Sequence, residues 1–219
     1  MIEVATEEER PDPSFFLHNL RNYVGSLISS TERLKADRSD ERALQLITKA
    51  ANLALRDLQA FTDLMRPLDL KTQGLVLTAW LRETVEAHEA NKKLTVEWDP
   101  ASQDLVSHAD PLRLAEAVGC ILANSLEAMP EGGAVSIGVT PSPEGWSCIR
   151  IEDRGGPMLR DVTLEMIGCP FFTLKPNRLG LGLSRARHIV HEHGGRMEIG
   201  RSPVGGLKIE FFLPPASPV

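Results

Sequence analysis

Residues 171–195 read FFTLKPNRLGLGLSRARHIVHEHGG, and two glycines in this stretch, Gly180 and Gly182, come directly before an expected helix over 183–193. The start of a helix exposes N–H groups without intrahelical partners at the positive end of its dipole, which together favour phosphate. Glycine lets the backbone approach a ligand closely, and Lys175 adds positive charge upstream. The segment predicts a phosphate site; an ordinary loop–helix junction is the alternative.

Two more segments carry side chains that suit a nucleotide. In IEDRGG (151–156) an apolar strand ends at Asp153 and Gly155 follows, so a carboxylate beside an approachable backbone can accept from an exocyclic amino group such as that of adenine. A simple Asp-Gly turn is the alternative. Asn124 lies inside the apolar helix expected over 112–129. Its amide oxygen suits Mg2+, or else a hydrogen-bonded place in the core.

The N-terminal part of the chain has the pattern of two heptad helices. Along each helix, residues recur at alternating steps of three and four, which makes a seam with one polar member in the first helix. The seam residues are Leu17, Leu20, Val24, Leu27, Thr31 and Leu34, followed by Leu44, Ile47, Ala51, Ala54, Leu58, Phe61, Met65 and Leu68. The polar segment 35–41 predicts a turn between them, and Pro67 limits the second helix. We therefore expect an antiparallel helical hairpin.

A second apolar set on these helices lies outside the two seams. It consists of Phe16 and Tyr23 on the first helix and Leu46 and Leu53 on the second. Uncovered apolar surface of this kind favours association. We expect a homodimer that forms a four-helix bundle; packing of this face on the rest of the chain is the alternative.

From about residue 75 the pattern changes to mixed strands and helices. Strands are expected at 94–100, 134–139, 148–153 and 207–213, in addition to the helices at 112–129 and 183–193. This order predicts an α/β sandwich with helices on one face of a sheet. The expected fold class is therefore α+β, with a helical hairpin followed by a sandwich domain.

Composition and charge exclude several classes of protein. With 219 residues, 42% of them hydrophobic, the chain can bury a sizeable core, and its net charge of −6 argues against a nucleic-acid partner. No apolar run reaches the roughly 18 residues that cross a membrane. Three widely spaced cysteines, Cys120, Cys148 and Cys169, offer neither a metal spacing nor an even disulfide set. We expect a cytoplasmic protein.

The order of these segments resembles a known family. CILANSLEAMPEGG, IEDRGG, PFFTLKP and RLGLGLSRARHIVHEHGG are similar to the four nucleotide-binding boxes of bacterial two-component sensor histidine kinases, which belong to the GHKL ATP-binding superfamily. FFLHNLRNYVGSL (15–27) resembles the phosphoacceptor box, and the closest subtype is that of short-lid nitrogen-regulatory sensors. The resemblance implies a dimerisation and phosphotransfer domain over 14–70 and an ATP-binding catalytic domain over 75–215.

The resemblance also implies roles for single residues. His18 would accept the phosphoryl group from Mg-ATP and pass it to an aspartate on a response-regulator receiver domain. Asn19 would lie beside it in the catalytic box, and Asn22 would orient a water for dephosphorylating the partner. Asn124 would bind magnesium and Asp153 would bind adenine. The remaining nucleotide-binding positions would be Gly155, Phe172, Lys175, Gly180, Leu181 and Gly182.

Four positions depart from the family pattern. Asn19 stands where an acidic residue is usual, and an amide can orient an imidazole but is a much poorer base, which bears on the autokinase rate. Tyr23 replaces a proline that kinks the helix. Cys120 replaces an Asn, or the Glu that activates water in hydrolytic relatives, and Pro157 replaces a glycine.

These departures leave alternatives to an active kinase. One is a degenerate kinase that acts as a histidine phosphotransfer or phosphatase protein with weak or no ATP use. Another is a different GHKL function, such as a serine kinase that switches a binding partner. Only about 14 residues precede the first expected helix, so we expect the input signal to come from a partner protein or from a longer chain.

Overall fold

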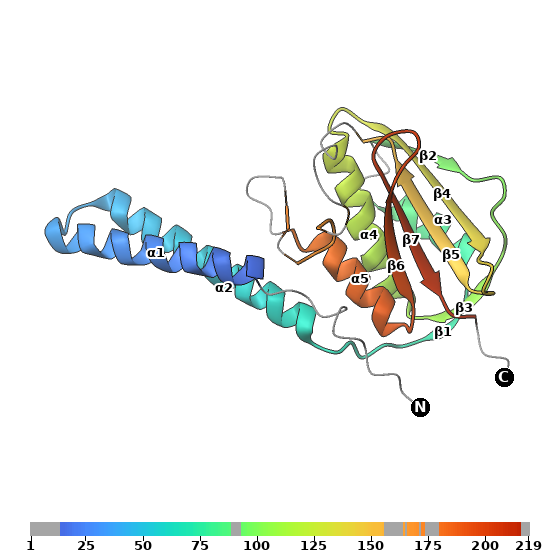
Figure 1. Cartoon of the computed structure of the whole chain (residues 1–219), viewed down its shortest axis with the longest axis horizontal. Coiled ribbons are helices and arrows are strands. Elements are labelled where there is room, and N and C mark those ends of the chain that lie inside the picture. The colour runs from blue at the N-terminus through green and yellow to red at the C-terminus, as the bar shows by residue number, and fades with distance from the viewer. Residues whose placement is uncertain are drawn as a thin grey trace. The chain divides into compact units, whose positions relative to one another are not determined.

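The computed structural model describes residues 14–88, 93–155, 164, 166–170, 172–173 and 180–215. Contacts divide the chain into two compact units, Met1–Arg66 with Cys169–Leu181, and Pro67–Gly168 with Gly182–Val219. The first unit holds a helical hairpin and the second holds a sheet with its helices (Figure 1). None of the helices in the described part of the chain has both the length and the apolar character needed to cross a membrane.

The hairpin consists of two helices, α1 (Ser14–Ala36) and α2 (Glu41–Met65) (Figure 1). Asp40, in the expected turn, caps α2 by accepting a 2.9 Å hydrogen bond from the N–H of Ala43. The guanidinium of Arg33 at the end of α1 binds the same side chain at 2.6 Å. Asp40 therefore both starts the second helix and ties it to the first.

The seam between the two helices is not the one that the heptad pattern predicts. Phe16 is buried and stacks on Phe61 with ring centroids 4.5 Å apart, and the hydroxyl of Tyr23 donates to Asp57. The prediction that Phe16 and Tyr23 stay outside the hairpin is therefore wrong. Leu17 and Val24, which it placed in the seam, are exposed.

Two contacts explain which stripe of α1 turns inward. The buried positions of α2 recur every seven residues, at Ala43, Ala50, Asp57 and Leu64. Phe16 and Tyr23 are also seven residues apart on α1, and they meet α2 at Phe61 and Asp57. The two stripes of α1 differ by one residue in register, so these contacts turn the aromatic stripe inward and leave the aliphatic stripe outside.

The second unit is built on a mixed sheet of five strands in the order β2-β4-β5-β7-β6. The strands are β2 (Leu94–Trp98), β4 (Gly133–Pro141), β5 (Ser147–Asp153), β6 (Arg196–Arg201) and β7 (Leu207–Leu213). β2 is parallel to β4, and the other neighbours are antiparallel. A small antiparallel sheet pairs β1 (Gln73–Val76) with β3 (Val106–Ala109). The helices are α3 (Leu77–Ala87), α4 (Pro111–Ala128) and α5 (Gly182–Glu192).

The two faces of the five-stranded sheet differ in character. One face carries buried apolar side chains that alternate along the central strands, namely Val135, Ile137, Val139, Ile149, Ile151, Ile209, Phe211 and Leu213. Figure 1 shows α4 and α5 side by side against the sheet. The other face is polar, with cross-strand pairs such as Arg150 and Glu210 at 2.9 Å. The expected α+β class, a hairpin followed by a sandwich, is confirmed.

Candidate functional site

Helix α4 positions the middle of the candidate site. Asp110 caps it by accepting hydrogen bonds from the N–H groups of Leu112 and Arg113, and Pro111 fits the first turn because a proline needs no N–H partner there. Buried apolar residues of α4 face the sheet. Asn124, near the C-terminal end of α4, is half-buried.

Asp153 lies at the end of β5 and is 3% exposed. Its Oδ1 accepts hydrogen bonds from the N–H groups of Gly155 at 2.9 Å and Leu207 at 3.1 Å. Its Oδ2 accepts one from the hydroxyl of Ser125 at 3.1 Å. A carboxylate oxygen has two lone pairs, so after the bond from Ser125 the Oδ2 atom can still accept from an amino group.

Two glycines make room for this carboxylate. A Cβ on Gly206 would collide with Oδ1 of Asp153, and Gly206 also has a φ of +62°, which side chains rarely adopt. A Cβ on Gly155 would come within 2.8 Å of Cβ of Ala128 on α4. The chain around Asp153 is therefore packed so tightly that larger residues at either position would displace the carboxylate.

The start of α5 comes next to the middle of α4. Gly182 is exposed, and a Cβ there would lie 4.0 Å from Cβ and from the carbonyl oxygen of Cys120. Glu116, Cys120 and Asn124 are spaced by four residues and so follow one another along one side of α4. Burial raises the pKa of Cys120 to about 11, and the negative charge of Glu116 adds to this shift.

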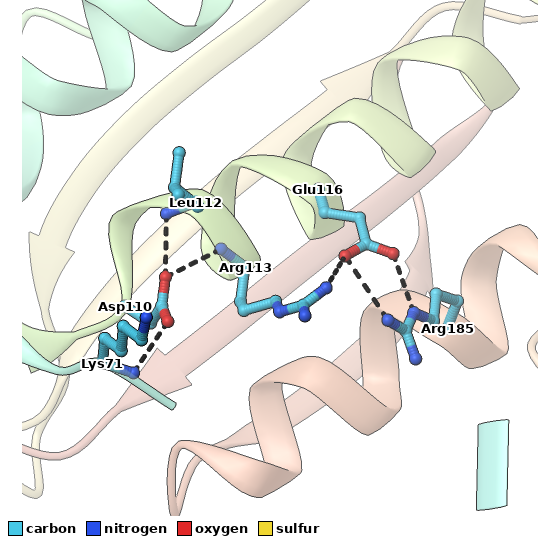
Figure 2. A network of polar contacts seen from close by, with 6 residues as sticks. All are labelled: Lys71, Asp110, Leu112, Arg113, Glu116 and Arg185. Carbon is cyan, nitrogen blue, oxygen red and sulfur yellow. Dashed lines mark hydrogen bonds and ion pairs between the residues drawn. The ribbon is translucent and has the colours of Figure 1, made fainter. Parts of the chain in front are cut away.

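A charged cluster joins α4 to α5 one turn below Cys120. Figure 2 shows the carboxylate of Glu116 between two guanidinium groups, Arg185 on α5 and Arg113 on its own helix. Nε of Arg185 donates to Oε1 of Glu116 at 2.8 Å, and Nη1 of Arg113 donates to Oε2 at 3.2 Å. Burial alone would raise the pKa of Glu116, but the hydrogen bonds and positive charges of Arg185, and then of Arg113, lower it.

The opposite ends of α4 and α5 are tied to the segment that follows the hairpin. The second oxygen of Asp110 accepts from the N–H of Lys71 at 2.8 Å (Figure 2), and the carboxylate of Glu192 accepts from the N–H of Leu68 at 3.1 Å. Nε2 of the buried His193 ring accepts a hydrogen bond from the N–H of Asp110. Its Nδ1 therefore carries the proton and donates it in a hydrogen bond to the carbonyl oxygen of Ile189.

The candidate phosphoacceptor box lies on α1. His18 and Asn22 are exposed and Asn19 is half-buried. Gly25 and Ser29 continue the exposed stripe at helical spacing, and nothing lies within 4 Å of a Cβ placed on Gly25. This stripe of small and polar residues leaves the surface around His18 open to a large partner.

The structure brings together some of the predicted site residues. Asp153 and Gly155 are in contact, and Asn124 and Gly182 belong to the same unit. Phe172, Gly180 and Leu181 belong to the unit of the hairpin, where Gly180 has a φ of +66°. Lys175, together with Pro157 and Phe171, lies outside the described residues.

Several residues of the site do not follow from the sequence reasoning. Ser125 and Gly206 support Asp153, and Glu116 and Arg185 link the two helices. Ser125 directly follows Asn124 on a helix side that faces the sheet, and Gly206 sits in a glycine pair before the last strand. Those two signals are visible in the sequence, whereas a pair 69 residues apart such as Glu116 and Arg185 is not.

Comparison with known proteins finds an ATPase family and sensor kinases that resemble this chain. Residues 109–217 match the family described as histidine kinase-, DNA gyrase B-, and HSP90-like ATPase. The sensor histidine kinase ZraS of Klebsiella oxytoca is 25% identical over 204 residues, which cover 90% of this chain and 44% of ZraS. The sensor protein FixL of Bradyrhizobium diazoefficiens is 31% identical over 206 residues, which cover 88% of this chain and 40% of FixL.

Solved structures share the fold. The crystal structure of full-length ShkA in complex with AMPPNP has a TM-score of 0.60 at 18% identity, and the match covers 96% of this chain and 48% of ShkA. The chain spans less than half the length of ZraS and of FixL.

Proposed function

The chain belongs, through residues 109–217, to the family of histidine kinase-, DNA gyrase B- and HSP90-like ATPases, and on that premise we propose that it is an ATP-dependent protein-histidine kinase. It phosphorylates His18 with Mg-ATP and passes the phosphoryl group to an aspartate on a response-regulator receiver domain. The observation that carries the proposal is an exposed histidine on a helical hairpin that precedes this ATPase-type domain in the same chain.

The residues around Asp153 fit an adenine base. The carboxylate is held by three donors, and Oδ2 keeps a lone pair for an exocyclic amino group. The start of α5 at Gly182 supplies N–H groups for phosphate oxygens. Gly155, Phe172, Lys175, Gly180 and Leu181 would complete the nucleotide site. Among the described residues, no group of three or more His, Cys, Asp or Glu side chains could hold a metal ion.

Asn124 would hold Mg2+ through its amide oxygen, since Mg2+ often takes only one or two protein ligands and completes its shell with phosphate and water. When bound, the ion neutralises the charge that develops on the phosphates during transfer. The neutral imidazole of His18 is the nucleophile. Asn19 orients the ring by hydrogen bonding, without acting as a strong base, so we propose a slow autokinase.

The exposed surface of the hairpin supports a homodimer. Seven large apolar residues described on α1 and α2 are more than one-third exposed: Leu17, Val24, Ile28, Leu44, Leu46, Leu55 and Leu58. All but Leu46 follow one stripe along each helix, outside the aromatic seam, and association of two hairpins into a four-helix bundle would bury these stripes. Sedimentation of the chain as a monomer at micromolar concentration would contradict the dimer. We place the kinase in the cytoplasm, where ATP and receiver domains meet it.

Phosphotransfer without autophosphorylation is the second candidate. It is favoured by Asn19 in place of an acid and by Cys120, whose pKa of about 11 keeps it a neutral thiol. In this function a phosphorylated receiver domain donates to His18, and Asn22 orients a water that dephosphorylates the partner. Asn22→Ala would then slow partner dephosphorylation, and an unchanged rate would count against the role.

Incubation with Mg2+ and γ-labelled ATP tests the two candidates. We expect acid-labile, base-stable label on the wild type, loss of label in His18→Gln, and full label in His108→Gln, a matched control in which another exposed histidine is replaced. An unlabelled wild type that accepts phosphate from a receiver domain would support the second candidate. Label that persists in His18→Gln would show that the phosphoacceptor lies elsewhere.

A further inference from the structure

We infer that Glu116 is a positioning residue that holds the phosphate-binding start of α5 against α4 through Arg185. The inference deepens the proposed function, because it concerns the same nucleotide site. It assigns a role to a carboxylate that is not among the proposed nucleotide-binding residues.

The first step is the geometry of the two helices. Gly182 on α5 approaches Cys120 on α4. Arg185, three residues further along α5, reaches Glu116, which lies four residues before Cys120 on α4. The helices therefore run antiparallel here, and two successive contacts follow their interface. Asn124 lies one turn beyond the first contact, on the side of α4 toward which the start of α5 points.

The second step is the difference between the two arginines. Arg185 makes two hydrogen bonds to Glu116, at 2.8 and 3.4 Å, and crosses between helices. Arg113 makes one at 3.2 Å from the same helix, at the i,i+3 spacing. The side chain of Arg185 is 20% exposed against 43% for Arg113, so the contact between helices is the better shielded of the two. Of these two arginines, Arg185 is the one that can restrain α5.

The third step is the sign of the charge. Glu116 contributes one negative charge between the guanidiniums of Arg113 and Arg185, one turn from the start of α5. If the cluster acted only through its electric field, removing the negative charge of Glu116 would strengthen the binding of an anionic nucleotide. If Glu116 acts by holding α5, the same change weakens binding. Glu116→Gln therefore separates the two roles by the direction of its effect.

The experiment compares Glu116→Gln, Arg185→Gln and Arg113→Gln in two measurements. The first is the Kd for Mg-ATP by calorimetry. We expect about a five- to tenfold weaker Kd for Glu116→Gln and Arg185→Gln, the size of a positioning effect between contacting elements, and less than a twofold change for Arg113→Gln. Arg185→Lys, which keeps one charged donor, is expected to recover part of the loss.

The second measurement is amide hydrogen exchange in the nucleotide-free chain. Residues 186–189 donate to the carbonyls of the first turn of α5, so their exchange reports how firmly this turn is held. We expect faster exchange there in Glu116→Gln and Arg185→Gln, with no change in the buried strand β5.

Each outcome decides between the explanations. Tighter binding in Glu116→Gln with unchanged exchange in α5 would overturn the inference and leave a field effect. Faster exchange over β5 as well would overturn it too, because that would mean a general loss of stability. A wild type that binds no Mg-ATP, with the expected changes in exchange, would overturn the proposed function and retain Glu116 as the residue that holds α5.

Discussion

The hydroxyl of Tyr23 on α1 donates a 2.9 Å hydrogen bond to Oδ2 of Asp57 on α2. Asp57 has no exposed surface, and the guanidinium of Arg56 lies 3.4 Å from its other carboxylate oxygen. A buried polar pair in a helical seam disfavours registers in which the two partners do not meet. This pair therefore helps to turn the aromatic stripe of α1 inward. Tyr23 lies five residues beyond His18 on the same helix.

Removal of the Tyr23 hydroxyl should weaken the hairpin. In Tyr23→Phe the ring still fills its place, but Asp57 loses its donor, and a buried acceptor left without its partner costs about 1–3 kcal/mol. The measurement is urea unfolding followed by circular dichroism. Tyr23→Phe combined with Asp57→Leu is the control, because removing both polar groups should recover most of the loss. Equal stability of Tyr23→Phe and wild type would mean that the bond contributes nothing.

The titration of Tyr23 can be followed without interference, because it is the only tyrosine in the chain. Burial raises its pKa above the ordinary value of 10.0, and the hydrogen bond and charge of Asp57 raise it further. A group whose pKa is raised on folding stabilises the folded state below its unfolded pKa, and this contribution is lost as pH rises through the folded pKa. We expect a tyrosinate absorbance midpoint above 10.0 that moves down in Asp57→Asn. A midpoint at 10.0 in both proteins would contradict the pair.

Much of the sheet domain follows from local sequence. The expected strand at 207–213 matches β7 residue for residue, and the helix expected at 112–129 is displaced by one residue from α4. These elements combine apolar periodicity with clear end signals, such as Asp110 before α4 and the glycine pair after α5. The expected ends of the hairpin helices rest on the same kind of signal, a polar turn and Pro67.

Four elements were not predicted: β1, α3, β3 and β6. The two strands of the small sheet, β1 and β3, have four residues each, and β6 (RMEIGR) carries charged side chains on its outer face. None of these three strands therefore gives a run of apolar residues. The choice of seam in the hairpin also failed, because two apolar stripes one residue apart satisfy the same period. The contacts of Phe16 with Phe61 and of Tyr23 with Asp57 decide between them, and these partners on the other helix are not local information.

Asp110→Asn should release the segment that follows the hairpin. Asp110 accepts on both oxygens, from α4 through Oδ1 and from the N–H of Lys71 through Oδ2. An Asn side chain can still cap the helix with its oxygen, but its NH2 group cannot accept from Lys71. We expect a loss of about 1 kcal/mol at pH 7 and faster amide exchange at Lys71. Asp104→Asn, at an exposed carboxylate, is the control for the lost charge.

The effect of Asp110→Asn should also depend on pH. Burial raises the pKa of Asp110, but the backbone donors Lys71, Arg113 and Leu112 together outweigh burial and lower it below 3.8. A carboxyl with a lowered pKa contributes its full stabilisation above the unfolded value, and this is lost as pH falls through the folded pKa. The difference between wild type and Asp110→Asn should therefore shrink below about pH 4. A difference that stays constant down to pH 3 would contradict the ionised cap.

Cys120 should behave as an inert thiol. Burial raises its pKa from 9.0 to about 11, and the charge of Glu116 adds to the shift. Since only the thiolate reacts, a pKa of about 11 in place of 9.0 leaves about a hundredfold less of the reactive form at neutral pH. In a chain with Cys148→Ser and Cys169→Ser, we expect iodoacetamide to modify Cys120 at least about a hundredfold more slowly in the folded protein than in urea. The folded rate should rise about tenfold per pH unit between 7 and 9.

The same property bears on the proposed reaction at the candidate nucleotide site. A neutral thiol is a poor base, so Cys120 cannot activate a water against ATP as a carboxylate in this position would. In the proposed kinase, hydrolysis of ATP should therefore be slow, and Cys120→Glu should raise the release of inorganic phosphate from ATP above that of wild type. Cys120→Ser, a neutral side chain of similar size, is the matched control and should leave hydrolysis low. Rapid alkylation of Cys120 at pH 7, or equal hydrolysis in all three proteins, would contradict this account of the site.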